Sequence, residues 1–266
     1  MAPAYVPYCG EAPIPGEVSW NIDPVLISIF CVVGASYMLG CRRIQTLAIR
    51  ERCYFGLGLF IAAAALVSPL CNLSVALFSA RVTQHVILTL IAAPLIVLGR
   101  AESAIAGMQK WGPSRSTRQP RFGAAASGVA YAAAMWTWHM PGPYDATLRS
   151  DAVYWLMHIT TFGSALAMWH FLLRRDQSHA GTTVTAVGTG IQMSLLGALL
   201  TLAPSPLFVV HYTTTWPWGL SPLQDQQLGG VIMWVLAGTL FTAYGLAAFA
   251  SWLDTNDGDA KPASSS

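Results

Sequence analysis

Seven long apolar runs dominate the sequence. A bilayer core about 30 Å thick needs roughly 20 apolar residues for each helical span. Runs of about this length occur at 24–41, 53–69, 79–98, 122–139, 153–173, 183–203 and 229–252. Of the 266 residues, 54% are apolar and only 10% are charged, whereas a typical soluble domain has about 25% charged residues. We therefore predict an all-α, polytopic membrane bundle of seven transmembrane helices.

The basic residues predict how this bundle is oriented. Twelve of the fourteen lysines and arginines fall in alternate loops and in the C-terminal tail: Arg42, Arg43, Arg50, Arg52, Arg100, Lys110, Arg115, Arg118, Arg121, Arg174, Arg175 and Lys261. Only Arg81 and Arg149 fall on the other side. Loops rich in lysine and arginine remain in the cytoplasm, so the N-terminus is expected outside and the C-terminus in the cytoplasm.

The remaining residues leave no room for a separate soluble domain. Residues 1–23 are expected to form a periplasmic N-terminal segment, residues 24–252 the transmembrane domain, and residues 253–266 a disordered, acidic and serine-rich cytoplasmic tail. The first apolar run begins late and has no basic segment before it, so no cleavable signal peptide is predicted. A surface helix is expected at 102–111.

Three histidines are predicted to meet near the outer face. His85 lies six residues into the third run, His158 five residues into the fifth, and His139 ends the fourth. At about 1.5 Å per residue, the first two lie roughly 9 Å below the outer surface. Ionisable residues inside a span are costly and are often functional, and histidine is the commonest metal ligand. These three residues form the predicted metal site.

Other polar or soft side chains are expected at the same level. Five of them are candidate additional ligands: Asp225, Gln226, Met140, Met157 and Cys71. Methionine favours Cu(I), so copper suits the site best, and zinc is permitted. Each residue also has a structural interpretation. Asp225 is a good N-cap for the last helix, and the methionines can simply pack. Cys71 can also pair with Cys9, since both are expected outside.

The other three histidines are expected to be structural or solvated: His170, His179 and His211. No Walker loop, G-x-G-x-x-G or G-x-S-x-G motif occurs, and the five cysteines form no C-x-x-C. Nucleotide-driven chemistry and a thiolate chaperone motif are therefore not encoded locally. The nearly balanced charge gives no indication of a nucleic acid partner.

Several blocks of the sequence resemble the CtaG family of membrane assembly factors for caa-type cytochrome c oxidase. They are Ser68-Pro69-Leu70, Phe78-Ser79-Ala80-Arg81, Gln84-His85, Trp138-His139-Met140-Pro141, Trp155-Leu156-Met157-His158 and Asp225-Gln226-Gln227-Leu228-Gly229-Gly230. The resemblance extends from about residue 50 to residue 252. It implies a bacterial plasma (inner) membrane protein that matures a haem-copper oxidase, at the copper step. It also implies that His85, His139, His158 and Asp225 form the polar core.

The main hypothesis is a non-enzymatic assembly factor. It would hold Cu(I) and pass the ion to a haem-copper oxidase subunit or to a periplasmic copper chaperone. A haem-binding membrane protein is an alternative, because two histidines on neighbouring helices can ligate haem iron. An intramembrane zinc hydrolase is another, with the three histidines as ligands and Asp225 as the base. A scaffold whose histidines are only structural remains open.

Overall fold

The computed structural model describes residues 5–44, 47–108, 123–173 and 179–259. These residues form helices and no strand. The helices are α1 (Pro24–Ile44), α2 (Ile49–Val67), α3 (Pro69–Ala76), α4 (Phe78–Val86), the π-helix η1 (Ile87–Ala92), α5 (Ala93–Leu98), α6 (Ala101–Met108), α7 (Gly123–Trp138), α8 (Pro141–Thr147), α9 (Asp151–Leu172), α10 (His179–Leu202), the 3-10 helices η2 (Val209–His211) and η3 (Trp216–Trp218), and α11 (Pro222–Asp259).

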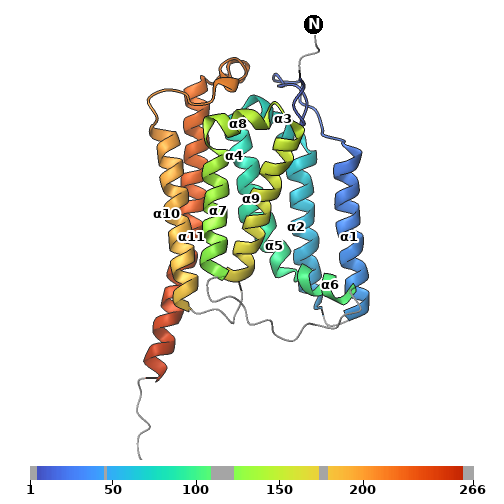
Figure 1. Ribbon diagram of the computed structural model, residues 1–266, viewed down its shortest axis with the longest axis vertical. Coiled ribbons are helices and arrows are strands. Elements are labelled where there is room, and N and C mark those ends of the chain that lie inside the picture. The colour runs from blue at the N-terminus through green and yellow to red at the C-terminus, as the bar shows by residue number, and fades with distance from the viewer. Residues whose placement is uncertain (1–4, 45–46, 109–122, 174–178, 260–266) are drawn as a thin grey trace, which may run out of the picture.

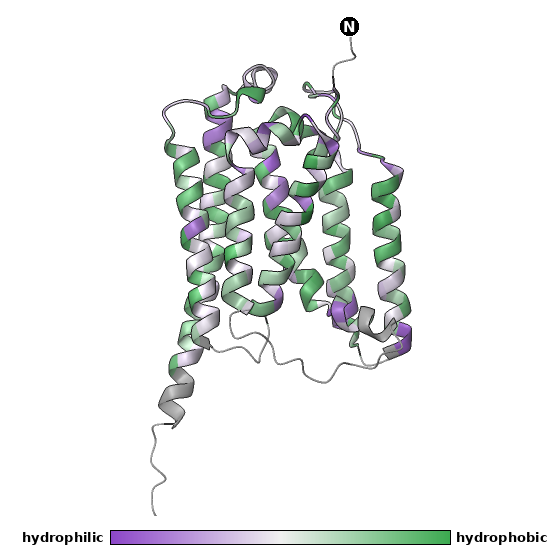
Figure 2. Ribbon diagram, viewed as in Figure 1, coloured by the Kyte–Doolittle hydropathy of each residue, from purple (hydrophilic) through white to green (hydrophobic). Residues whose placement is uncertain are grey.

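The long helices stand side by side as a bundle, and the short helices cover its ends (Figure 1). Residues 5–23 lie at the end that carries α3 and α8, and α11 finishes at the opposite end (Figure 1). The sides of the bundle are hydrophobic over most of their length, and hydrophilic residues gather towards the helix ends (Figure 2). Large apolar side chains such as Val129, Ile159 and Val184 are exposed on these sides. Such a surface suits a hydrocarbon environment.

All seven predicted segments are helical, which confirms the all-α prediction. Four of the described helical segments are long and apolar enough to cross a membrane: 24–43, 78–98, 180–202 and 222–253. The pair α2 and α3, bent by 47° at Ser68, brings the number to five if the two helices form one broken span. With 16 residues α7 is too short to qualify alone, and the 22-residue α9 is too polar on average. Seven crossings and the orientation of the termini therefore stay predictions.

The third predicted span is one continuous helix with a π-helical middle. Pro94 lacks an amide hydrogen, and its ring crowds the carbonyl group one turn earlier. The chain passes through η1 immediately before this proline, and the hydroxyl of Thr89 donates to the carbonyl of His85 at 2.7 Å. Insertions of this kind are common at functional sites, and this one begins two residues after His85.

The last two long helices pack closely because small residues face each other. A Cβ atom at Gly230 would lie 2.8 Å from the carbonyl oxygen of Gly197, and one at Gly238 would lie 2.5 Å from Oγ of Ser194. Small residues permit this approach in lipid. The last helix begins at Pro222, seven residues before the predicted span, and continues to Asp259, beyond the predicted end at residue 252.

Three predicted features fall wholly or partly outside the described residues. The surface helix expected at 102–111 is present as α6, which ends at Met108. Residues 109–122 and 174–178, with their lysines and arginines, are not described, nor is the end of the tail from residue 260.

The N-terminal segment is fastened to α3 by a disulfide and by one asparagine. Cys9 and Cys71 are joined, with 5.4 Å between their Cα atoms. The side-chain amide of Asn72 donates to the carbonyl oxygens of Cys9 and Glu11 at 3.0 and 2.8 Å, and its oxygen accepts from the amide of Ser19. The pairing that the sequence left open is therefore present, and residues 5–23 form a cap over one end of the bundle.

Removing the disulfide should destabilise the protein. The bond closes a loop of 62 residues, and such cross-links typically contribute about 2–4 kcal/mol. We expect the double variant Cys9→Ala/Cys71→Ala to show a clearly lower midpoint of thermal unfolding in detergent. Cys31→Ala, which replaces an exposed free cysteine, should leave the midpoint unchanged. An unchanged midpoint in the double variant would contradict a stabilising role for the bond.

Candidate functional site

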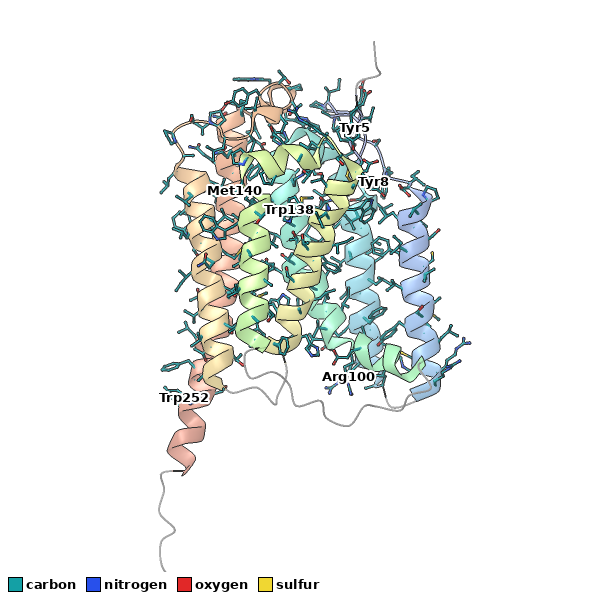
Figure 3. All side chains as sticks on the ribbon, viewed as in Figure 1. Tyr5, Tyr8, Arg100, Trp138, Met140 and Trp252 are labelled. Carbon is teal, nitrogen blue, oxygen red and sulfur yellow. A yellow bond between two sulfur atoms is a disulfide. The ribbon has the colours of Figure 1, made fainter. Side chains whose placement is uncertain are left out.

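Three elements bring the predicted histidines together. His85 lies near the end of α4, His139 directly follows α7, and His158 lies in the second turn of α9. The ring centroids of His85 and His158 are 5.5 Å apart, and those of His85 and His139 are 6.2 Å apart. His139 lies between Trp138 and Met140, which are labelled in Figure 3. These three residues are called the histidine cluster below.

The hydrogen bonds of the cluster leave imidazole nitrogens free. The Nδ1 atoms of His139 and His158 lie 2.7 and 3.1 Å from the carbonyl oxygens of Met135 and Tyr154. A carbonyl only accepts, so both Nδ1 atoms carry the proton and both Nε2 atoms keep a lone pair. No partner among the described residues reaches Nε2 of His158 or either ring nitrogen of His85. Buried nitrogens are usually paired, so these atoms are able to accept a water molecule or a ligand.

The spacing of the rings can be compared with that around an ion. A metal lies about 2.0–2.1 Å from an imidazole nitrogen and hence about 3.2 Å from the ring centroid, so two rings on one ion have centroids about 5–6 Å apart. The separation of His85 and His158, 5.5 Å, falls in this range, and that of His85 and His139, 6.2 Å, lies just above it. Nevertheless, the described residues contain no group of three His, Cys, Asp or Glu side chains already positioned to hold an ion. Rings would have to turn to converge.

The cluster is more enclosed than the sequence suggested. Its three side chains are only 3–6% exposed, although the sequence predicts a site near the outer face. The ring of Phe78 lies edge-on to His139 at 6.1 Å and stacks on Phe208 at 4.4 Å, and Tyr144 packs against both phenylalanines. This aromatic layer covers the cluster. The aromatic layer is present because the loop after α10 folds back over the bundle. The spacing of apolar residues in the sequence does not predict the course of this loop.

His211 supports the aromatic layer. Its Nε2 lies 2.7 Å from the hydroxyl of Tyr144, and its Nδ1 lies 3.3 Å from Oγ1 of Thr214. Burial, together with the positive charge of Arg81, lowers the pKa of His211 to about 3. The ring is therefore neutral. Because the hydroxyl of Thr214 donates to the carbonyl of Ala76, its oxygen accepts from Nδ1 of His211, and Nε2 accepts a hydrogen bond from the Tyr144 hydroxyl. The prediction that His211 is structural is consistent with this contact, but the side chain is buried and lies away from solvent.

Arg81 is a buried cation beside the cluster. It lies one helical turn before His85 and is only 1% exposed. One guanidinium nitrogen donates to Oγ1 of Thr147 at 2.5 Å, and the group lies 5.1 Å from the centre of the Tyr144 ring. Nε and Nη2 have no partner among the described residues. Placing this charge in a span is costly, so Arg81 belongs to the site.

Asp225 has a role that differs from the predicted one. It was expected to cap the last helix or to join the site, but its carboxylate accepts from the amides of Phe78 and Ser79 at 2.6 and 3.1 Å and from the Ser79 hydroxyl at 2.5 Å. Asp225 therefore caps α4 from α11. The residue before α4, Leu77, has no side chain that can do so. A carboxylate at a helix N-terminus also interacts favourably with the helix dipole.

The other proposed ligands are engaged elsewhere. Gln226 joins two segments, since its side chain donates to the carbonyl of Leu200 at 3.1 Å and accepts from the amide of Leu207 at 2.7 Å. Met140 is 55% exposed at the start of α8, and Met157 is buried in the main core. Cys71 is in the disulfide, so it offers no thiolate to a metal.

Tyr154 was not selected from the sequence, yet it connects the N-terminal cap to the cluster. Its carbonyl orients His158, and its ring lies 4.2 Å from that imidazole. Its hydroxyl lies 3.4 Å from Sγ of Cys9 and 3.6 Å from Sγ of Cys71. A spacing of four residues along a helix could have indicated both Tyr154 before His158 and Arg81 before His85.

Comparison with known proteins gives one clear result. Neither a curated protein nor a solved structure matches this chain. The family model of the cytochrome c oxidase caa3 assembly factors (Caa3_CtaG) matches residues 35–255. This range contains the whole histidine cluster, Arg81 and Asp225, and it confirms the resemblance seen in the sequence blocks. The chain therefore belongs to the cytochrome c oxidase caa3 assembly factor family.

Proposed function

We propose that this assembly factor handles copper for a haem-copper oxidase, with Cu(I) as cargo bound by His85, His139 and His158. The observation that carries the proposal is the set of unpartnered nitrogens on His85 and His158, which are buried side by side. Neutral imidazole is a suitable ligand for copper. The hydrogen bonds from Nδ1 of His139 and His158 to carbonyl oxygens leave Nε2 of each ring as the atom with a free lone pair, a tautomer that is usual for metal-bound histidines.

The charge beside the cluster favours transient binding. The guanidinium of Arg81 repels a cation held by the neighbouring histidines, and no carboxylate among the described residues lies within ion-pair distance of it. A site of neutral ligands next to a buried positive charge holds copper less tightly than one with a thiolate or carboxylate. Weak retention suits a protein that must release the ion to an oxidase subunit or to a periplasmic copper chaperone.

Two features support a bacterial inner-membrane location with the cluster near the periplasmic side. The Cys9–Cys71 disulfide lies at the same end of the bundle as the cluster, and disulfides persist in oxidising compartments such as the periplasm. The arginines at 42, 43, 50, 52 and 100 lie at the opposite end, in or beside α1, α2 and α6. Arg100 is labelled there in Figure 3. Cytoplasmic loops are enriched in such residues.

The hydrolase alternative receives no comparable support. Its base, Asp225, already accepts three hydrogen bonds at the start of α4. A two-haem form of the haem alternative would need a second pair of histidines near the other face, where the sequence offers His170. The Nδ1 atom of His170 instead lies 2.6 Å from Oε2 of Glu102. Copper transfer by ligand exchange remains the function that the described contacts support best.

Removing imidazoles from the cluster should abolish copper binding. We expect His85→Ala and His158→Ala, purified without oxygen and loaded with Cu(I), to retain no copper in elemental analysis, whereas the unaltered protein retains about one ion per chain. Cells carrying either variant should contain oxidase with less copper. His170→Ala is the matched control, because it removes a histidine from the other end of α9. Full copper content in the oxidase of both cluster variants would refute the proposal.

Removing the charge of Arg81 should strengthen copper binding. Arg81 lies one helical turn before His85 on α4, and two unit charges roughly 8 Å apart repel by about 2 kcal/mol at an effective dielectric constant of about 20. We therefore expect Arg81→Gln to bind Cu(I) tenfold or more tightly than the unaltered protein in a competition titration with a chromogenic chelator. Arg81→Lys keeps the charge and should change the affinity little. Weaker binding by Arg81→Gln in protein that still melts cooperatively would contradict this electrostatic account.

A further inference from the structure

Five arginines gather at the end of the bundle opposite the disulfide. Two lie in the last turn of α1, two in the first turn of α2 and one between α5 and α6: Arg42, Arg43, Arg50, Arg52 and Arg100. All five residues are exposed. Because α1 ends at Ile44 and α2 begins at Ile49, the first four arginines lie near one another. These five residues are called the arginine cluster below.

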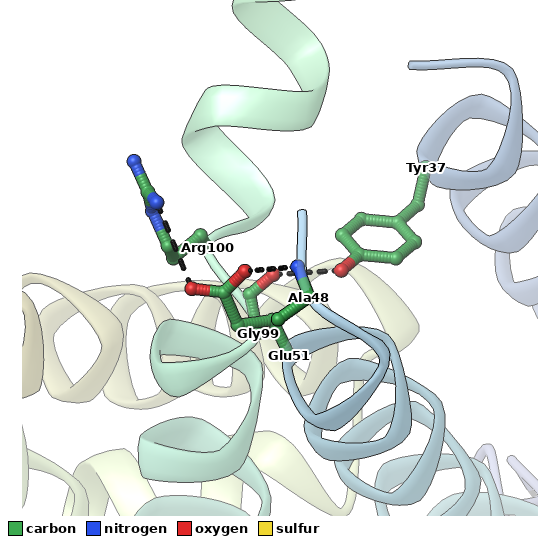
Figure 4. Close-up of polar contacts among 5 residues, drawn as sticks. All are labelled: Tyr37, Ala48, Glu51, Gly99 and Arg100. Atoms are coloured by element: carbon green, nitrogen blue, oxygen red, sulfur yellow. Dashed lines mark hydrogen bonds and ion pairs between the residues drawn. The ribbon is translucent and has the colours of Figure 1, made fainter. Parts of the chain in front are cut away.

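A compact polar junction holds the fifth arginine beside α2, as Figure 4 shows. The carboxylate of Glu51 accepts from the amide of Ala48 at 2.7 Å and lies 3.6 Å from the guanidinium of Arg100. The hydroxyl of Tyr37 on α1 donates to the carbonyl of Gly99 at 2.7 Å. Three separate parts of the chain are therefore tied together here, and the arginine cluster is a fixed feature of the fold.

The arginine cluster lies where the apolar sides of the bundle end. Helix α6 lies across the ends of α1 and α2 (Figure 1), and a Cβ atom at Gly40 would collide with the carbonyl oxygen of Ala104. Exposed apolar side chains on α1 and α2, including Met38, Leu39 and Tyr54, come within about one turn of the arginines. Arginines in this position extend their charged ends towards the lipid head groups.

The positive charge of this end is not balanced within the protein. Residues 38–60 and 98–104 contain the five arginines and two glutamates, an excess of three positive charges. Both glutamates are engaged, since Glu51 contacts Arg100 and Glu102 lies 2.6 Å from Nδ1 of His170 on α9. Clusters of four to eight basic residues directly beside a membrane span are typical of sites that bind anionic lipids.

The backbone at Arg100 gives a second, independent indication. Its φ of 51° is left-handed, and no other described residue except glycine has a positive φ. Glycine adopts this conformation without a steric cost, so the turn into α6 does not require an arginine. The side chain is 53% exposed, and an ion pair of this kind with Glu51 adds little stability. Residues held in such conformations cluster at functional sites.

We propose that the arginine cluster binds the head group of an anionic phospholipid. Guanidinium groups form paired hydrogen bonds with phosphate oxygens, and those of Arg50, Arg52 and Arg100 hold the phosphate. The acyl chains lie against the exposed apolar sides of α1 and α2. A ligand that is both anionic and apolar matches the two adjoining surfaces, which neither a free phosphate ion nor an acidic protein segment does. This inference goes beyond copper handling and does not rest on it.

Native mass spectrometry of the purified full chain tests the proposal. The protein, in an uncharged maltoside detergent, is mixed with equal amounts of phosphatidylglycerol and phosphatidylcholine that have identical acyl chains. We expect phosphatidylglycerol to be retained preferentially. An excess of inorganic phosphate should displace little of it, because the ion lacks the acyl chains. Equal retention of the two lipids, or full displacement by phosphate, would overturn the proposal.

A double variant measures the contribution of the arginines on α2. One basic side chain at an anionic membrane surface strengthens binding about fivefold, so Arg50→Gln/Arg52→Gln should bind phosphatidylglycerol roughly twentyfold more weakly and phosphatidylcholine as before. Arg149→Gln is the matched control, because it removes an exposed arginine at the other end of the bundle. It should change neither lipid. An unchanged preference for phosphatidylglycerol in the double variant would contradict the assignment.

A substitution at Arg100 separates lipid binding from stability. Arg100→Gly removes the guanidinium and also relieves the left-handed backbone. We expect its preference for phosphatidylglycerol to fall about fivefold, while the midpoint of thermal unfolding does not fall. Arg100→Lys keeps the charge and should keep most of the preference. An unchanged preference in Arg100→Gly, or a midpoint that falls together with it, would show a purely structural role for Arg100 and contradict the proposal.

Discussion

The capping of α4 by Asp225 is the interaction on which the site depends. The first amides of a helix have no intrahelical acceptors, and in an apolar surrounding each unsatisfied amide costs several kcal/mol. Because the carboxylate comes from α11, it fixes where α4 starts and how that helix lies against its neighbour. Arg81 and His85 follow on the same helix, so their positions beside α7 and α9 depend on this one carboxylate. A residue of the last helix, α11, therefore sets the position of the polar side chains on α4.

Much of the architecture could be predicted from the sequence because apolar length is a strong signal. All seven segments are helical, and His85, His139 and His158 do approach one another, as the depth of each within its run indicated. The pattern was weaker for α7 and α9. These helices carry the polar and aromatic residues of the site, and those residues shorten or dilute the apolar run. The polar and aromatic residues around the histidine cluster therefore make α7 and α9 harder to identify as membrane spans from the sequence.

The features that could not be predicted are tertiary contacts between distant segments. Asp225 was interpreted as a cap for its own helix, since sequence reasoning considers neighbours along the chain, and its actual partners are about 146 residues away. The sequence places Arg81 on the outer side, within the first residues of the third run, but it does not show that Thr147 and the Tyr144 ring surround the guanidinium. The aromatic layer likewise needs a loop to fold back over the bundle, so the cluster is enclosed rather than open to the outside.

The contact between Tyr154 and the disulfide has a consequence for the order of events during biogenesis. Cys9 and Cys71 can join only after their ends of the chain have reached a compartment that oxidises thiols. Until then Cys9 and Cys71 are not covalently joined beside the hydroxyl of Tyr154, and the N-terminal cap of residues 5–23 is not cross-linked to α3. In a newly inserted chain the surroundings of the histidine cluster would thus be incomplete, and their completion would follow disulfide formation rather than synthesis.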